Sequence, residues 1–521
     1  MSVPKNSVRP PLKSGTPIRV RSGSAAGICL LAALPCPPAL AQLRPIEASL
    51  QTTLTATNNG AGAPAGQEQS DAILVVQPRV RLERRSAGLS LSGDAGVSLV
   101  SSANNTRRSR ALPEAGLIAD ASLVDRLLNL EGAVDVRQVE QDPFATRVDP
   151  NSPDNALTSA TYRLSPVLRH EFSPRLSLVA RDDETWTRYS GEQGNDNRSR
   201  ATSVRLLSKP QSLGGSLEAV EQRVTYAQGA DADWRSRSIL ATVNYAYANE
   251  WVVGVVAGSE RSTFALSSQT DTRAGLRLFW SPGPRTEMIA AADRRYFGNG
   301  WEFRLRHRTP ATALLLRAVR EPTAGNLVGG IASGSRLEDF FGAILTTRLP
   351  DPQQRAAAVA DLMATRGLQD ALPGVAGITA NYPQRRTGGE ATWVMLGTRH
   401  TVTLTAFAQS LSQLTLRDGS PLVAVPADAD NRQAGGSLGL NRRLSPVMSI
   451  DGLGRWSRIQ GYGSHAGEET RETLYRLTLV RNLSPHTGVS LGVLRRSIDT
   501  QSATADSYKE TAGFLGMNHR F

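Results

Sequence analysis

Apolar and polar residues alternate along most of this chain, from about Ile46 to Phe521, in runs that are separated by turn residues. The clearest run is 301–308, WEFRLRHR, in which large side chains alternate with charged ones. A period of two places successive side chains on opposite faces of a β-strand. A soluble sheet shows the same pattern, but its repetition along nearly the whole chain favours a transmembrane barrel. One face of such a barrel meets lipid and the other a wet lumen.

The connections between the runs alternate in length. Short connections contain Ser-Pro after a bulky apolar residue, at 172–174, 280–282, 444–446 and 483–485. Long polar stretches lie between them, at 58–70, 101–110, 141–155, 190–197 and 420–430. Short periplasmic turns and longer outer loops are typical of bacterial barrels. We therefore predict an all-β fold: a large antiparallel transmembrane β-barrel of about 22 strands, within a range of roughly 18–24.

The last run, 513–521, alternates up to an aromatic residue, Phe521, as the final strand of outer-membrane barrels usually does. Counting back in pairs from Phe521 places the Ser-Pro turns on the periplasmic side and the long polar stretches on the outer side. We expect the strand that ends at Phe521 to be recognised by the barrel-assembly machinery. His519 departs from the aromatic or aliphatic residue that is common near this end. Aromatic residues near the ends of other runs, at 296, 301, 456 and 475, suit interfacial girdles.

Two segments interrupt the alternation without ending a run. Ser165-Pro166 lies inside one run, and proline cannot donate to a central ladder, so it predicts a bulge or a strand extension. The run 176–189 contains three consecutive acids, at 182–184, which also predicts a bulge or an extension beyond the membrane.

One segment, 321–382, breaks the rhythm and is too long for a loop without structure of its own. Asp351-Pro352 has the form of an N-cap followed by proline at the first helical position. Apolar residues at 356, 359, 362 and 363 follow at helical spacing, and Gly367 is the expected stop. Pair counting places this helical insert on the outer side. Two alternatives stay open: a lid or lumen plug, and a surface helix that only covers the barrel mouth.

The first 41 residues have the composition of a secretory signal peptide. Basic residues precede an apolar core at 25–34, and a small-x-small cleavage site ends at Ala41. A disordered basic tail is the alternative. The predicted organisation is a signal peptide at 1–41 and a barrel at 42–521. Both cysteines, Cys29 and Cys36, lie in the leader, so we expect the mature barrel to have neither disulfides nor thiolate ligands.

The charge balance is basic, with a net charge of +12 and a pI of about 10.2. The arginines are spread one or two to a run, without a basic stripe or an aromatic stacking motif, which argues against nucleic acid as a partner. Basic charge on an exported barrel suits anionic lipopolysaccharide or an anionic polymer better. We therefore expect outer-membrane lipid and lipopolysaccharide as partners, in the outer membrane of a Gram-negative bacterium.

The chain carries no signature of catalysis. Its histidines are scattered, with none at zinc-ligand spacing, and no G-x-S-x-G elbow is present. The glycine-rich stretch 435–439 lacks the context of a nucleotide site. His307 is the one faint candidate for a barrel-borne lipid hydrolase, and a packed or interfacial histidine is the simpler interpretation. We expect no enzyme activity, no catalytic residue, no metal and no cofactor.

A charged face remains as a candidate lumen lining. It comprises Asp293, Arg295, Glu302, Arg304, Arg306 and Arg308. One interpretation is structural, because opposite charges on adjacent strands pair and rigidify the wall. The other is a basic constriction that favours anionic solutes or an anionic polymer.

Three stretches carry a resemblance to a known family: 274–282 (AGLRLFWSP), 293–299 (DRRYFGN) and 305–309 (LRHRT). The chain resembles the PEP-CTERM/exosortase-associated outer-membrane proteins, which are encoded near exopolysaccharide export genes in proteobacteria. The likeness extends from about Leu50 to Phe521, and Thr57-Asn58-Asn59 is a weaker match to a Thr-Asp-Asn-like element. The resemblance implies a fold and a location, together with exopolysaccharide export proteins as partners. It carries no catalytic residues.

Three functional hypotheses follow. The leading one is an outer-membrane channel or export component for exopolysaccharide or surface-protein secretion, with no chemistry of its own. The second is a structural or adhesive protein whose plugged barrel does not conduct. The third, a barrel-borne lipid hydrolase, is disfavoured by the missing active-site cluster. A large secreted array of β-sandwiches would have the same hydropathy.

Overall fold

The computed structural model describes residues from Ile46 to Phe521, with several gaps. The described residues are 46–140, 142–145, 155–191, 195–209, 212–228, 233–248, 250–264, 267–323, 336–366, 368, 372, 382–416, 430–502 and 505–521. The predicted signal peptide at 1–41, with both cysteines, lies outside them, as do Gly367 and parts of the predicted long loops. No helix in these ranges is both long and apolar enough to cross a membrane.

The first half of the sheet is a series of long strands. They are β1 (Glu47–Thr57), β2 (Asp71–Arg85), β3 (Leu89–Ser102), β4 (Arg110–Val124), β5 (Leu128–Glu140), β6 (Ala156–Glu171), β7 (Leu176–Tyr189), β8 (Asn197–Ser208), β9 (Leu213–Tyr226), β10 (Trp234–Tyr247) and β11 (Trp251–Phe264). The predicted run 176–189 is therefore one strand, β7, that contains all three acids.

The second half continues the series, with a helical insert between β15 and β16. Its strands are β12 (Ser268–Gly283), β13 (Thr286–Arg295), β14 (Gly298–Arg308), β15 (Thr312–Thr323), β16 (Gln384–Leu396), β17 (His400–Gln413), β18 (Asn431–Ser445), β19 (Met448–Gly461), β20 (Glu469–Asn482), β21 (Thr487–Gln501) and β22 (Tyr508–Arg520). The helices are α1 (Leu337–Leu345), α2 (Pro352–Arg366) and the short 3-10 helix η2 (Gly463–His465).

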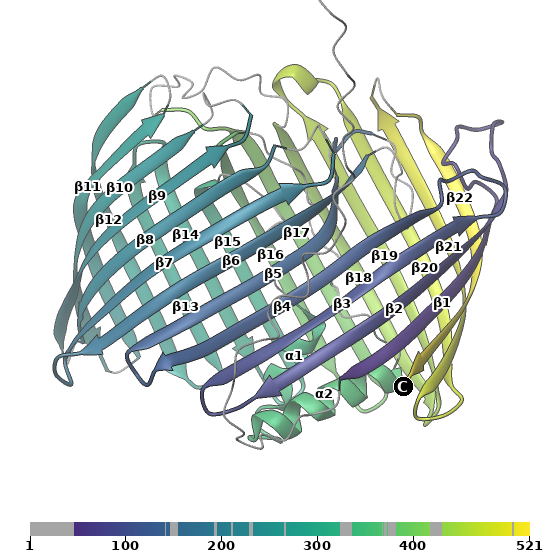
Figure 1. Cartoon of the computed structure of the whole chain (residues 1–521), viewed down its shortest axis with the longest axis horizontal. Helices are drawn as coiled ribbons and strands as arrows, with labels where there is room; N and C mark the ends of the chain where they lie inside the picture. Colours follow the sequence, from purple (N-terminus) through teal and green to yellow (C-terminus); the bar gives the residue numbers. More distant parts are fainter. Residues whose placement is uncertain are drawn as a thin grey trace, which may run out of the picture. The chain divides into compact units, whose positions relative to one another are not determined.

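These strands close into a barrel, as Figure 1 shows. Each strand pairs antiparallel with the next along the chain, and β1 also pairs with β22. A closed sheet satisfies the backbone hydrogen bonds of every strand internally, which is the requirement for a sheet that spans lipid. The prediction of a large antiparallel barrel of about 22 strands is confirmed by a 22-stranded sheet.

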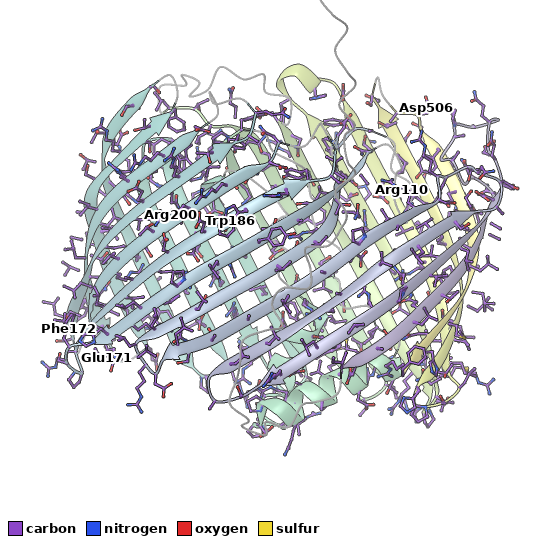
Figure 2. All side chains as sticks on the ribbon, in the orientation of Figure 1. Arg110, Glu171, Phe172, Trp186, Arg200 and Asp506 are labelled. Carbon is purple, nitrogen blue, oxygen red and sulfur yellow. The ribbon has the colours of Figure 1, made fainter. Side chains whose placement is uncertain are left out.

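The two ends of the barrel differ in their connections. We call the end with short connections, such as 172–175 and 483–486, the turn end, and the end that contains 58–70 the loop end. Figure 2 shows Phe172 at the turn end and Asp506 at the loop end. The predicted Ser-Pro pairs lie in or beside the turn-end connections, as pair counting expects. Two turn-end connections that it missed are 86–88 and 397–399.

Pro166 interrupts the pairing of β6 with β7. The pairs run to Leu164–Glu184 and resume at Val167–Arg181 in the same register, so only the pairing between them is interrupted. Proline has no N–H to give to the ladder, which accounts for the gap. No residue is inserted, so the predicted bulge is wrong, and Pro166 lies within the regular strand β6.

The outer face of the wall is apolar over its middle. On β10, Ile239, Val243 and Tyr245 alternate with buried or partly buried side chains and are each more than half exposed. Near the turn end, Trp251 and Trp280 stack with their ring centroids 5.3 Å apart. Large exposed hydrophobic side chains on the outside of a closed barrel, with aromatic residues at the margin, are what a lipid-facing belt requires.

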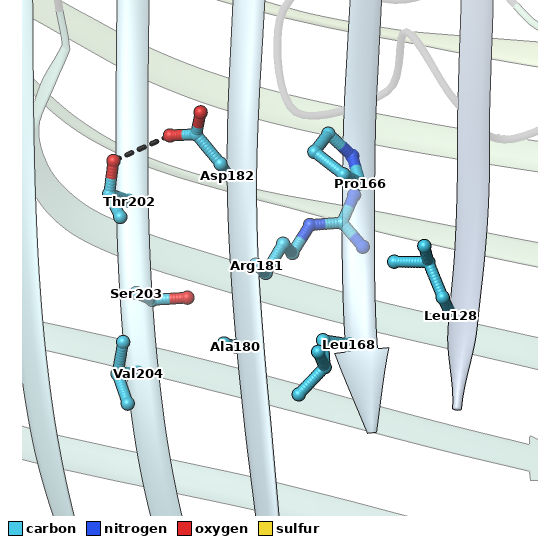
Figure 3. A pocket seen from close by; sticks show the side chains of 9 residues that line it. All are labelled: Leu128, Pro166, Leu168, Ala180, Arg181, Asp182, Thr202, Ser203 and Val204. Carbon is cyan, nitrogen blue, oxygen red and sulfur yellow. Dashed lines mark hydrogen bonds between the residues drawn. The ribbon is translucent and has the colours of Figure 1, made fainter. Parts of the chain in front are cut away.

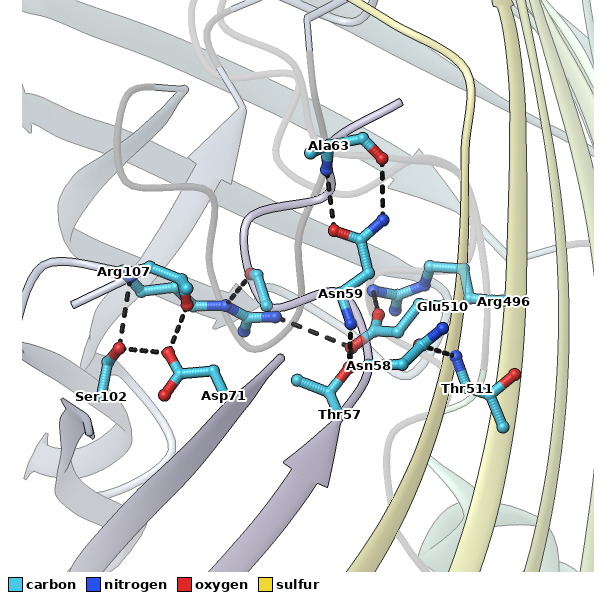
Figure 4. Close-up of polar contacts among 12 residues, drawn as sticks. Thr57, Asn58, Asn59, Ala63, Asp71, Ser102, Arg107, Arg496, Glu510 and Thr511 are labelled. Carbon is cyan, nitrogen blue, oxygen red and sulfur yellow. Dashed lines mark hydrogen bonds and ion pairs between the residues drawn. The ribbon is translucent and has the colours of Figure 1, made fainter. Parts of the chain in front are cut away.

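A polar cluster at the loop end reinforces the closure between β1 and β22, and we call it the seam cluster (Figure 4). It consists of Thr57, Asn59, Arg107, Arg496 and Glu510, each at most 7% exposed. The Thr57 hydroxyl donates to the Glu510 carboxylate at 2.9 Å. Arg107 and Arg496 each have a guanidinium nitrogen 3.8 Å from that carboxylate. Thr57-Asn58-Asn59 therefore lies at the point where the barrel closes.

Candidate functional site in the lumen

The insert between β15 and β16 folds into a helical pair. Helix α2 begins at Pro352, and the Asp351 carboxylate accepts the N–H of Gln354 at 2.8 Å, which is the N-cap that the sequence predicts. Helix α1 was not predicted. Its signal is present, however, since five of its nine residues form an apolar stripe at helical spacing.

The apolar stripe of α1 packs on the inner wall near the turn end. Phe341 and Ile344 are fully buried in a cluster that includes Ala313 and Leu315 of β15 and Val394 of β16. Burial of such side chains contributes about 1.5–3 kcal/mol each. The hydrophobic effect therefore holds α1 against this part of the wall.

Polar contacts connect the helical pair to three sides of the wall. Glu338 of α1 lies 3.2 Å from Arg81 of β2, and Thr347 accepts from Arg308 of β14 at 3.3 Å. On a third side, Asn482 of β20 donates to a carbonyl of α2 at 3.1 Å. Strands β2, β14 and β20 are far apart around the wall, and the contacted residues lie towards the turn end of each strand. The helical pair therefore extends across the barrel opening at the turn end (Figure 1).

The insert is attached at one end of the barrel and docked at the other. Thr323 and Gln384, which flank it, form a pair at the loop end. The helices lie near the turn end, where Figure 1 shows them. The outer-side position expected from pair counting therefore applies to the attachment points and not to the helices. The reason is that the apolar partners of α1 lie on the wall near the turn end.

Arg366, at the end of α2, anchors the insert to the wall. Its guanidinium donates to the carbonyls of Gly397 and Thr398 at 3.0 and 3.2 Å. Its own carbonyl accepts from Asn441 and Ser449, both at 3.0 Å. The last carbonyls of a helix lack partners within the helix, and here side chains of the wall provide them. We call this group of contacts the Arg366 latch.

The register places the predicted charged residues on the inner face. Arg306 and Arg308 pair across β14 and β15 with Leu315 and Ala313, which contact the helices. Glu302 and Arg304 follow at the same two-residue spacing. Asp293 and Arg295 are on the same face of β13, since they pair with Gly300 and Gly298 at even spacing from Glu302.

Most of these charges have partners of opposite sign. Arg304 donates to Glu302 at 3.0 Å. Asp293 accepts from Arg273 of β12 at 2.6 Å, and Arg295 donates to Glu260 of β11 at 3.0 Å. Arg308 donates to Thr347 of the insert and to the carbonyl of Pro284. Structural pairing therefore accounts for much of this face, while Arg304 and Arg306 still line the lumen.

An aromatic cluster lines the inner wall towards the loop end. Tyr296 and Phe297, in the connection between β13 and β14, are at most 2% exposed and contact Trp234 and Phe264. Tyr296 is therefore not a girdle residue. The connection between β13 and β14 turns inward, so Tyr296 packs inside the barrel. Sequence alternation alone did not reveal this, because the residue lies in a connection.

The described residues show no arrangement for chemistry in this lumen. Among them, no group of three or more His, Cys, Asp or Glu residues has the geometry to hold a metal ion. The His307 ring lies 2.8 Å from the hydroxyl of Thr286 on the outer face. What the arrangement offers is a charged conduit with a helical pair docked in it.

A closed antiparallel sheet with an apolar outside and a charged inside is a transmembrane β-barrel. No protein-family model and no curated protein sequence matches the chain. Solved structures to which the chain is similar include three proteins, each matched over 92% of this chain. They are the FrpB iron transporter from Neisseria meningitidis (9% identity, 83% of that chain, TM-score 0.46), the ferric enterobactin receptor PfeA from Pseudomonas aeruginosa (10%, 82%, 0.45) and Pseudomonas aeruginosa OpdK (10%, 100%, 0.33).

Proposed function

We propose that this protein is a gated outer-membrane channel in which the helical insert is the plug. The observation that carries the proposal is the docking of α1 and α2 inside the barrel, by an apolar face and by the Arg366 latch. A lumen with charged walls conducts ions when it is open, and a docked helical pair obstructs it.

The proposal includes a preference for anions. Arg304 and Arg306 line the lumen, and Arg304 also pairs with Arg317 across β14 and β15. Rings and rows of basic side chains favour anionic solutes. An anionic polysaccharide or a charged export intermediate is the cargo class that this wall suits. The link to exopolysaccharide or surface-protein secretion is supported by the family resemblance alone.

Planar-bilayer conductance of the purified, folded protein tests the gate. We expect small or rare openings from the intact chain, and a large steady conductance once residues 324–383 are replaced by a short Gly-Ser turn. Heat-modifiable migration in gels shows whether each variant keeps a folded barrel. A folded deletion variant that does not conduct would refute the channel and favour the structural or adhesive alternative.

A further inference from the structure

The outer wall of β7–β11 changes character between the apolar belt and the loop end. In the belt, the outward positions are large and apolar, as at Leu217, Ile239 and Val255. Nearer the loop end, the outward positions of the same strands become charged. Six arginines and three carboxylates occupy this patch: Asp182, Glu184, Arg198, Arg200, Glu221, Arg223, Arg235, Arg237 and Arg261. We call it the arginine patch.

Three of its arginines lie side by side. Arg200 of β8 pairs with Arg223 of β9, and Arg223 pairs with Arg235 of β10. Like charges directly opposite one another destabilise a sheet unless an anion lies between them. The side chains of Arg200 and Arg235 are 58% and 41% exposed, so the row is open to the surroundings.

The carboxylates of the patch do not balance it. Asp182 accepts two hydrogen bonds from Arg200 at 3.0 Å, and Glu221 accepts from Arg235 at 2.6 Å. Arg223 and Arg261 have no carboxylate partner within the described part of the chain. The surplus of positive charge lies at the upper margin of the belt, which is the depth of lipid headgroups.

A groove on the same outer face continues from the patch into the belt (Figure 3). Leu128, Leu168, Ala180 and Val204 lie in one row across β5–β8 and line a space of about 180 Å³. The small side chain of Ala180 leaves this space open. Asp182 and Thr202 form its upper edge, next to Arg200.

From this juxtaposition we propose a binding site for a phosphorylated lipid of the outer leaflet, of the lipid A type. Its phosphates bind across the Arg200–Arg223–Arg235 row, and one acyl chain lies in the groove below. Phosphate oxygens accept charge-assisted hydrogen bonds from arginine forks, which relieves the like-charge row. This proposal rests on the location of the protein in the outer membrane and does not require that the barrel conducts ions. A failed conductance test would therefore not contradict the lipid site.

The test measures binding of bis-phosphorylated lipid A to the full chain in detergent. The variant combines Arg200→Gln, Arg223→Gln and Arg235→Gln. Its matched control combines Arg294→Gln, Arg432→Gln and Arg495→Gln, which removes three exposed outward arginines from strands that are not neighbours. We expect the row variant to bind on the order of a hundredfold more weakly, and the control less than tenfold. Equal losses in the two variants, or no loss in the first, would overturn the site.

Two further experiments distinguish binding of the whole lipid from binding of phosphate alone. Lipid A without phosphates is expected to bind much more weakly than the phosphorylated form, and millimolar inorganic phosphate is expected to compete poorly. Ala180→Trp fills the groove without a change in charge and should weaken lipid A binding. Full competition by inorganic phosphate, or unchanged binding by Ala180→Trp, would show that no acyl chain occupies the groove. Heat-modifiable migration verifies the fold of each variant.

Discussion

Arginines on the inner and outer faces of this wall have different surroundings. On the inner face, Arg273 and Arg496 each meet a carboxylate on the next strand, and Arg295 meets Glu260 two strands away. All three side chains are at most 15% exposed. On the outer face of β8–β10, arginines meet one another and are about half exposed. The same residue type thus closes the barrel on one face and presents surplus charge on the other. Cross-strand neighbours, rather than composition, decide which role an arginine has.

The largest expected effect is at the seam cluster. Glu510→Ala leaves Arg107 and Arg496 buried around a missing charge, and we expect the free energy of unfolding to fall by about 3–5 kcal/mol. Urea unfolding in lipid vesicles, followed by heat-modifiable migration, measures this. A decrease of less than about 1 kcal/mol in the free energy of unfolding would mean that buried inner-face ion pairs stabilise the barrel no more than exposed ion pairs do.

The Arg366 latch ranks second. Arg366→Gln removes hydrogen bonds from a cation to two carbonyls of the wall, and such bonds contribute about 1.5–3 kcal/mol. We expect more frequent channel openings with little change in barrel unfolding. Arg355→Gln is the control, because Arg355 bonds only to Leu349 and Pro350 of the insert itself among the contacts described. Equal openings from both variants would contradict the latch.

Neutralising the lumen should have a smaller effect. Arg304→Gln combined with Arg306→Gln removes two basic side chains from the inner face and is expected to lower the anion-to-cation permeability ratio a few-fold. Reversal potentials of the insert-deleted barrel in a salt gradient give this ratio. The Arg294→Gln, Arg432→Gln and Arg495→Gln control should leave it unchanged. Unchanged selectivity in the lumen variant would leave only the structural interpretation of that face.

The smallest change in stability is expected at the outer patch. Glu221→Gln breaks exposed pairs with Arg235 and Arg237, so the free energy of unfolding should change by less than about 1 kcal/mol. The same variant raises the local positive charge and should tighten lipid A binding, more so at low salt. Weaker binding by Glu221→Gln would mean that the carboxylate positions the arginines rather than competing with the ligand.

The fold could be predicted from the sequence because a barrel repeats one local rule. The period of two in 301–308 and the Ser-Pro turns are local signals, and they predicted the strands and the turns. The bulge predicted at Pro166 is absent, because the register of β6 with β7 is the same on both sides of it. The register of neighbouring strands cannot be deduced from the sequence. The row of Arg200, Arg223 and Arg235 was therefore not predicted, because these residues lie on three different strands. The depth at which the insert docks also depends on non-local packing, as the contact of Ile344 with Val394 illustrates.

The candidate lumen residues were also proposed from a local signal, the period of two along each strand. Alternation places Glu302, Arg304 and Arg306 on one face, but it does not say which partners they have. Their partners lie on other strands or in the insert, as with Arg308 and Thr347. Thr57-Asn58-Asn59 had no functional interpretation in the sequence, because the neighbours of Asn59 come from the other end of the chain.

The join between β1 and β22 also constrains how the chain folds. The hydrogen bond from Thr57 to Glu510 connects residues that are 453 positions apart. Local hairpins form early, whereas contacts of such high sequence separation form late and slowly because loop closure opposes them. Until then β1 and β22 are open edges that invite pairing with other chains. A change at the seam is therefore expected to slow the final step of folding and to favour aggregation, in addition to its effect on the stability of the finished barrel.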